Sequence, residues 1–124
     1  LARALQQRRP AVRISLPFAM GAALPKPVMS TVLERHGSKH FRVGLAELNG
    51  WRASMEDAHV VHLDDERCEG YFGILDGHGG ADCSAWCSKR LQEQLAEEGC
   101  PTSDAATKKM VLDIDAAFLA TGLT

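Results

Sequence analysis

The stretch YFGILDGHGG, residues 71–80, constrains the fold of this chain more than any other. An apolar run ends abruptly at Asp76 and is followed by three glycines and one histidine. Apolar runs of this length that are bounded by glycines are typical of a buried strand. Because strand side chains alternate between faces, Phe72, Ile74 and Asp76 share a face. We expect this face to point into the core, where a carboxylate needs a partner charge or a metal ion.

The segment WRASMEDAHVVHL, residues 51–63, predicts a strand that precedes this one. On an extended strand, Arg52 and Glu56 lie on the same face as the apolar Val60, which indicates that the face is buried. If the two strands run side by side, Glu56 and Asp76 converge in one crevice with Arg52 nearby. Carboxylates brought together in this way repel each other unless a cation lies between them.

Carboxylate oxygens select hard cations such as Mg²⁺ or Mn²⁺. Gly77 has no Cβ, so its backbone can approach such a cation closely and its carbonyl can be a ligand. Arg52 beside the metal ions is suited to binding a phosphate group through two hydrogen bonds. His78 can donate a proton to a leaving oxygen. These residues together predict a phosphoryl-transfer site.

Each motif alone has a simpler interpretation. The sequence DGHGG fits a tight turn into a helix, and the adjacent acids Glu56 and Asp57 fit a solvated pair of charges. The glycines also begin a dinucleotide-binding fingerprint, but its third glycine falls at Asp82. A carboxylate at this helix N-terminus would repel a pyrophosphate, so the dinucleotide interpretation is disfavoured.

Charge is distributed unevenly along the chain. Residues 1–44 carry a formal charge of +7 and the remainder carries −9. An acidic body suits cation binding better than nucleic-acid binding, so we expect no nucleic-acid partner. The four cysteines have no CxxC spacing, and Cys83 and Cys87 lie one helical turn apart among apolar neighbours. We expect these two to be buried in a reducing, cytoplasmic environment, with a nuclear or membrane-associated location as the alternatives.

Residues 1–40 are predicted to form a basic N-terminal extension and linker, with Pro25 and Pro27 marking the linker. If translation starts at Met20, Gly21 would be exposed for myristoylation. One acyl chain would give only weak membrane association.

The folded part is predicted over residues 41–124, beginning with a strand near residues 41–46. Two helices, over residues 81–98 and 103–121, are predicted to follow the three strands. The apolar positions that predict their buried faces are Cys83, Trp86, Cys87, Leu91 and Leu95 in the first helix, and Met110, Val111, Ile114, Ala117 and Phe118 in the second. This order of elements predicts the α+β class.

The segments GWRASMEDAH, residues 50–59, and DGHGG, residues 76–80, resemble the paired signatures of the metal-dependent protein serine/threonine phosphatase family, protein phosphatase 2C. The joint presence of both in this order is highly specific, and a looser similarity extends from Met20 to the end of the chain. The resemblance implies a four-layer α-β-β-α sandwich, of which this chain would form the N-terminal part. It also implies phosphoserine and phosphothreonine proteins as substrates.

The resemblance further implies a role for each matched residue. Two Mg²⁺ or Mn²⁺ ions, bridged by Asp76, would activate a water for hydrolysis of the phosphate ester. The metal-binding positions would be Glu56, Asp57, Asp76 and Gly77, with Asp57 holding metal-bound water and Gly77 using its carbonyl. Arg52 would bind the substrate phosphate, and His78 would act as the general acid.

The sequence departs from the family in one respect. The family draws further metal-binding aspartates from the C-terminal part of its domain, and this sequence ends at Thr124. We therefore expect little or no turnover from this chain alone, and a monomer when the domain is complete. The alternative is a non-catalytic pseudo-phosphatase or binding module of the same fold.

Overall fold

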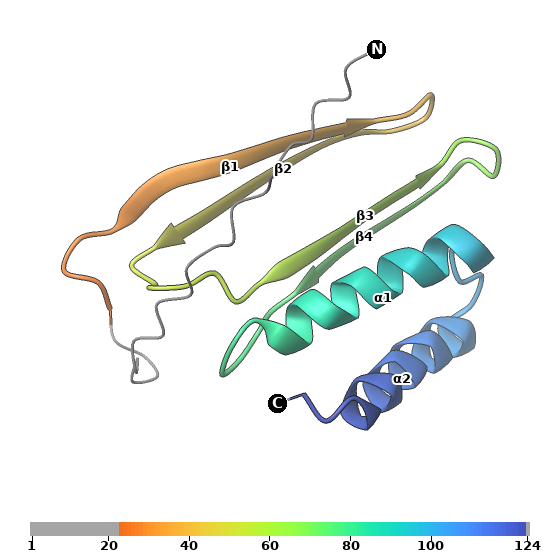
Figure 1. Ribbon diagram of the computed structural model, residues 1–124. Helices are drawn as coiled ribbons and strands as arrows, with labels where there is room; N and C mark the ends of the chain where they lie inside the picture. The colour runs from red at the N-terminus through yellow and green to blue at the C-terminus, as the bar shows by residue number, and fades with distance from the viewer. Residues whose placement is uncertain (1–22, 124) are drawn as a thin grey trace, which may run out of the picture.

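The computed structural model describes residues 23–123 as two β-hairpins followed by two helices (Figure 1). The elements are β1 (Val28–Gly37), β2 (Arg42–Gly50), β3 (Ala58–Asp64), β4 (Glu69–Leu75), α1 (Asp82–Glu98) and α2 (Asp104–Ala120). Each hairpin is an antiparallel two-stranded sheet, and the two sheets share no ladder. This arrangement confirms the predicted α+β class. Neither helix of the described residues is long and apolar enough to cross a membrane.

The structure has four strands where the sequence predicted three. Val28–Gly37, which the sequence analysis placed in the linker, forms β1 and pairs with β2. Most β1 side chains are exposed. The strand is therefore held by its backbone ladder rather than by a buried apolar face, and alternation could not predict it. Met20 and Gly21, to which the myristoylation hypothesis applies, lie outside the described residues.

The predicted strand over residues 51–63 is wrong in its first half. The strand β3 begins only at Ala58, and the residues before it form an irregular loop. Ala58 pairs with Leu75, the last residue of β4, so the residues before Ala58 have no partner with which to form a ladder. Arg52 and Glu56 therefore do not share a strand face, and Arg52 is exposed.

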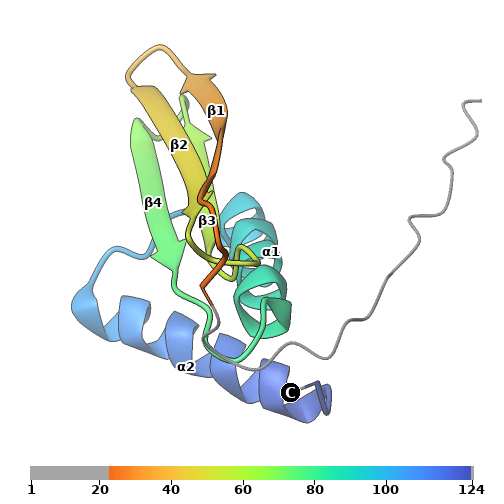
Figure 2. The ribbon, with the colours of Figure 1, turned by 90° about the vertical axis from the view of Figure 1, so that its left-hand side faces the viewer.

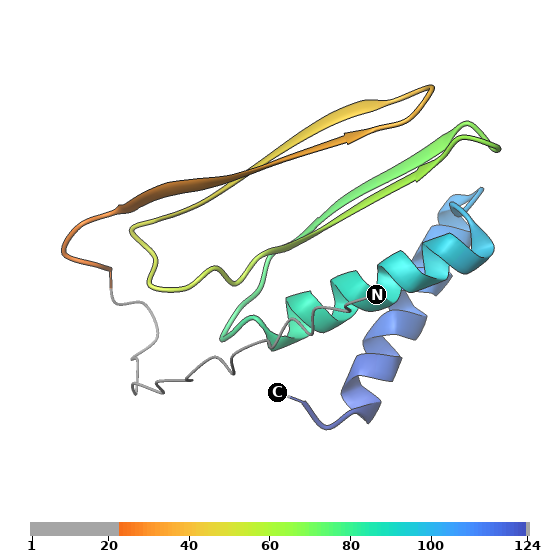
Figure 3. The same cartoon turned by 45° about the horizontal axis from the view of Figure 1, so that its top comes forward.

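The core lies between the β3–β4 hairpin and the helices. Figures 1 and 3 show α1 running along this hairpin, with α2 packed against α1. The buried apolar side chains are Val60, Leu91, Leu95, Met110, Ile114 and Phe118. Tyr71 and Leu75 of β4 pack against this cluster. The prediction that Phe72 and Ile74 point into the core is therefore wrong, since Phe72 is 51% and Ile74 70% exposed. The opposite face of β4 is the one that packs against the core.

The predicted buried faces of the helices are correct in part. Two leucines of α1 and three apolar residues of α2 lie in the core as expected, but Cys83, Val111 and Ala117 are exposed. Cys87 is half-buried, and burial together with the neighbouring Cys83 thiol raises its pKa to about 11. The Cys87 thiol therefore stays protonated at neutral pH and behaves as a small apolar group.

The two hairpins contact each other through side chains. His59 of β3 lies with Nδ1 2.7 Å from a carboxylate oxygen of Glu47 and Nε2 3.7 Å from one of Glu34. At the far end, the Lys39 amide donates to the Asp65 carboxylate at 2.9 Å. Figure 2 shows the two hairpins lying alongside each other.

The helix α2 begins with a capping serine. The Ser103 hydroxyl accepts a hydrogen bond from the Ala106 amide at 3.2 Å. We expect Ser103→Ala to lower the free energy of unfolding by about 1 kcal/mol, because this amide then loses its partner. Urea denaturation followed by circular dichroism measures the change. Ser88→Ala is the control, since the Ser88 hydroxyl bonds only to the Ala85 carbonyl of its own helix, and equal midpoints for both variants would contradict the prediction.

Candidate active site

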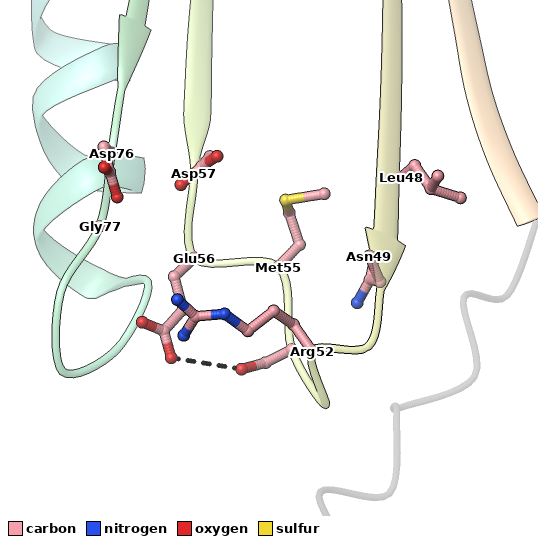
Figure 4. A pocket seen from close by; sticks show the side chains of 9 residues that line it. Leu48, Asn49, Arg52, Met55, Glu56, Asp57, Asp76 and Gly77 are labelled. Atoms are coloured by element: carbon pink, nitrogen blue, oxygen red, sulfur yellow. Dashed lines mark hydrogen bonds between the residues drawn. The ribbon is translucent and has the colours of Figure 1, made fainter. Parts of the chain in front are cut away.

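A pocket of about 240 Å³ lies where the loop between β2 and β3 meets the end of β4 (Figure 4). Its lining residues are Leu48, Asn49, Arg52, Ser54, Met55, Glu56, Asp57, Asp76 and Gly77. Five of the six site residues expected from the sequence are among them, and His78 lies just outside. The loop, rather than a strand face, brings Arg52 and Glu56 to the pocket.

Pairing between β3 and β4 brings two of the carboxylates together. Ala58 and Leu75 are opposite each other in the ladder. Asp57 immediately precedes Ala58 and Asp76 immediately follows Leu75, so both carboxylates emerge at the same end of the hairpin. The Asp76 side chain is 74% exposed.

The loop backbone passes very close to Gly77. A Cβ placed on Gly77 would lie 2.1 Å from the Glu56 carbonyl oxygen and 2.9 Å from Ser84 Oγ. Real Cβ atoms do not approach other atoms so closely, so only glycine fits here. The absence of a side chain at Gly77 therefore allows the Glu56 backbone to lie against the end of β4.

Polar side chains at the pocket interact weakly with their neighbours. The His78 Nδ1 atom lies 3.4 Å from an Asp76 carboxylate oxygen, with the His78 side chain 85% exposed. The Ser54 hydroxyl donates to a Glu56 carboxylate oxygen at 3.4 Å. The Asp76 and Glu56 carboxylates therefore keep lone pairs available for a ligand.

The donor groups at the pocket are carboxylate and carbonyl oxygens, which is the chemistry that Mg²⁺ and Mn²⁺ require. Within residues 23–123, no three His, Cys, Asp or Glu side chains converge closely enough to hold a metal ion as they stand. The Asp57 and Asp76 side chains are exposed, and Gly77 has no side chain that would cover its carbonyl. The chemical types of these donor groups therefore fit a hard divalent cation.

Comparison with known proteins identifies the family. The family model described as "Protein phosphatase 2C" matches residues 41–120, which include both motifs of the pocket. The chain belongs to the protein phosphatase 2C family. The matched segment fits the N-terminal portion of the protein phosphatase 2C domain, and the two hairpins and two helices are a partial form of its α+β fold.

Curated relatives match the chain over a limited length. The chain is 38% identical over 89 residues to "Probable protein phosphatase 2C 21" of Arabidopsis thaliana, covering 71% of this chain and 25% of the relative. It is 39% identical to "Probable protein phosphatase 2C 60" of the same plant, with the same coverage. "Protein phosphatase 2C homolog 2" of Saccharomyces cerevisiae is 33% identical over 84 residues, or 64% of this chain and 18% of the relative. The chain thus spans about a quarter or less of these protein phosphatase 2C relatives.

Sequence reasoning missed Ser84 of α1, which contacts the backbone of the loop that lines the pocket. Ser84 is 4% exposed and its hydroxyl donates to the Glu56 carbonyl. A signal was present in the sequence, because Ser84 precedes Leu91 by seven residues and therefore lies on the buried face of α1. A polar residue on such a face needs a hydrogen-bond partner from elsewhere in the fold.

Proposed function

We propose that this chain contributes the front part of a Mg²⁺- or Mn²⁺-dependent protein serine/threonine phosphatase. One observation carries the proposal: the Arg52 guanidinium and the carboxylates of Glu56, Asp57 and Asp76 line a single pocket. A cationic group suited to phosphate and a set of oxygen donors suited to divalent cations are the two requirements of phosphate-ester hydrolysis. Its substrates would be phosphoserine and phosphothreonine proteins.

Each of the six candidate site residues has a task in this proposal. Divalent cations, when bound, would neutralise phosphate charge and lower the pKa of a water molecule. The groups that would hold them are the carboxylates of Glu56 and Asp76, the carbonyl of Gly77 and, through water, the carboxylate of Asp57. Arg52 would grip two phosphate oxygens and orient the phosphorus for in-line attack. His78 would donate a proton to the leaving serine or threonine oxygen.

A binding module of the same fold is the second candidate function. It is favoured by the observation that no three metal-ligating side chains converge within residues 23–123. Such a module would use Arg52 to recognise a phosphorylated protein without hydrolysing it.

Removal of the metal distinguishes the two candidates. We expect the full-length product of the gene to hydrolyse a phosphothreonine peptide with Mn²⁺, to lose this activity in EDTA and to regain it when excess Mn²⁺ is restored. Phosphate release measures the rate, and a peptide with unmodified threonine gives the background. Full activity in EDTA would refute the metal-dependent mechanism. Binding of the phosphopeptide without turnover in Mn²⁺ would instead support the binding module.

A further inference from the structure

Among the residues that the structure describes, Ser84 is the one buried polar residue. It lies in the first turn of α1, on the face that carries Leu91 and Leu95. Burial of a hydroxyl is unfavourable unless a hydrogen bond replaces its contacts with water. The partner of the hydroxyl therefore indicates why a serine is accommodated here.

The hydroxyl has two candidate acceptors. Ser84 Oγ donates to the Glu56 carbonyl, and it also lies 3.1 Å from the Ala81 carbonyl oxygen. A serine hydroxyl has one proton. The Ala81 carbonyl already accepts the Ala85 amide at 3.0 Å within the helix. The Glu56 carbonyl lies in an irregular loop without a ladder partner. It therefore needs a hydrogen-bond donor more than the Ala81 carbonyl does.

Three segments meet at this bond. The Glu56 backbone precedes β3, Gly77 follows β4, and Ser84 lies in α1. A Cβ on Gly77 would come within 2.9 Å of both the Glu56 carbonyl carbon and Ser84 Oγ, so the three groups are in direct contact. The side chains on either side of this junction, those of Glu56, Asp57 and Asp76, are the carboxylates of the pocket.

We propose that Ser84 is a positioning residue for the metal-binding carboxylates. Its hydroxyl holds the Glu56 backbone against Gly77, and this fixes the direction in which the Glu56 and Asp57 carboxylates leave the loop relative to Asp76. Ser84 touches neither the substrate nor a metal ion. The role in metal binding rests on the proposed function, whereas the tethering of the loop stands independently of it.

Hydrogen exchange tests the tether without any metal. In the full 124-residue chain, Ser84→Ala should speed exchange of the amides at the near end of the β3–β4 ladder, in the Ala58–Leu75 and His59–Ile74 pairs, about tenfold. The Glu56 carbonyl then loses its donor, so the loop before β3 is freed and this end of the ladder opens more often. The amides of Leu91 and Leu95 should change less than twofold. Ser84→Thr keeps the hydroxyl and should restore slow exchange, and Ser88→Ala is the matched control on the same helix. Unchanged exchange at these ladder amides, or equal acceleration throughout α1, would overturn the proposal.

Calorimetric titration with Mn²⁺ tests the consequence for the carboxylates. We expect Ser84→Ala to weaken Mn²⁺ binding about tenfold, as is usual when a group that orients ligands is removed. Ser84→Thr and Ser88→Ala should bind within twofold of the parent chain. Equal affinity of Ser84→Ala and the parent would overturn the role in metal binding. A parent chain that binds no Mn²⁺ would instead count against the proposed function, and hydrogen exchange would still decide whether Ser84 tethers the loop.

Discussion

Under the proposed function, we expect replacement of Asp76 by asparagine to lower metal-dependent phosphopeptide hydrolysis by the full-length protein about 10³-fold. Asp76 follows β4 directly, at the end of the β3–β4 ladder, and in the proposed function it is one of the groups that would hold a divalent cation. The asparagine side chain has nearly the same shape but no charge, so it removes attraction for the cation without disturbing packing. Loss of metal assistance is worth several kcal/mol of transition-state stabilisation, which corresponds to this change in rate. The measurement is kcat at saturating peptide with Mn²⁺ in excess.

Asp82→Asn is the matched control for Asp76→Asn. Asp82 is an exposed carboxylate in the first turn of α1, six residues further along the chain, and it does not line the pocket. Its replacement should change kcat by less than threefold, because it alters only the charge near the site. An equal loss in both variants would show that general electrostatics, and not ligation by Asp76, supports the reaction. Full activity of Asp76→Asn would exclude Asp76 from metal binding.

Replacing Gly77 by alanine lowers the free energy of unfolding of the chain by about 3 kcal/mol. The added methyl group would lie 2.1 Å from the Glu56 carbonyl oxygen and 2.9 Å from the buried Ser84 hydroxyl. Relief of this overlap requires the backbone before β3 to move away from β4 and α1, since a carbonyl group cannot rotate aside as a flexible side chain does. Urea denaturation of the 124-residue chain, followed by circular dichroism, measures the loss.

Gly44→Ala is the control that separates crowding from the general effect of replacing glycine. Gly44 lies within β2, has no atom within 4 Å of the position of an added Cβ, and does not have a positive φ. We expect its replacement to change stability by less than about 1 kcal/mol. If Gly77→Ala unfolds at the same urea concentration as Gly44→Ala, the close approach of the Glu56 backbone does not contribute to stability.

The parts of the fold that the sequence predicted well are those determined by nearby residues. The helix ends follow local signals, namely the Ser103 cap of α2 and the Gly99 that ends α1 with a φ of +82°. The buried positions of Leu95 and Ile114 follow from helical spacing, because one face of each helix packs against the core.

The errors concern pairing between distant segments. Arg52 and Glu56 alternate with other residues as a strand would, but β4 ends at Leu75 and offers them no partner. The strand β1 was missed because pairing with β2 does not require an apolar face. The orientation of Phe72 depends on which face the helices cover, and a single strand's alternation does not indicate that choice.

For the candidate site too, the sequence predicted the residue types but not their arrangement in space. The residue types at positions 52, 56, 57 and 76 indicated a phosphate and a hard cation, and the structure places all four around one pocket. Their spatial relation depends on the register of β3 with β4 and on the contact between Gly77 and the loop. Neither feature could be derived from alternation within one segment, and the contribution of Ser84 depends on the same contact.

The absence of a shared ladder between the hairpins has a mechanical consequence for the pocket. Shifting one sheet along the other breaks no hydrogen bond of either β-ladder. It disturbs instead the contacts between the hairpins, such as that of His59 with Glu47, the bond from the Lys39 amide to the Asp65 carboxylate, and the edge-on packing of Phe41 and Phe72 at 6.1 Å between ring centroids. Asn49 lies near the end of the first hairpin and Asp76 directly after the second, so the pocket lies between the two hairpins. The relative position of Asn49 and Asp76, on opposite sides of the pocket, is therefore set by side-chain contacts and by the connecting loop rather than by a shared backbone ladder.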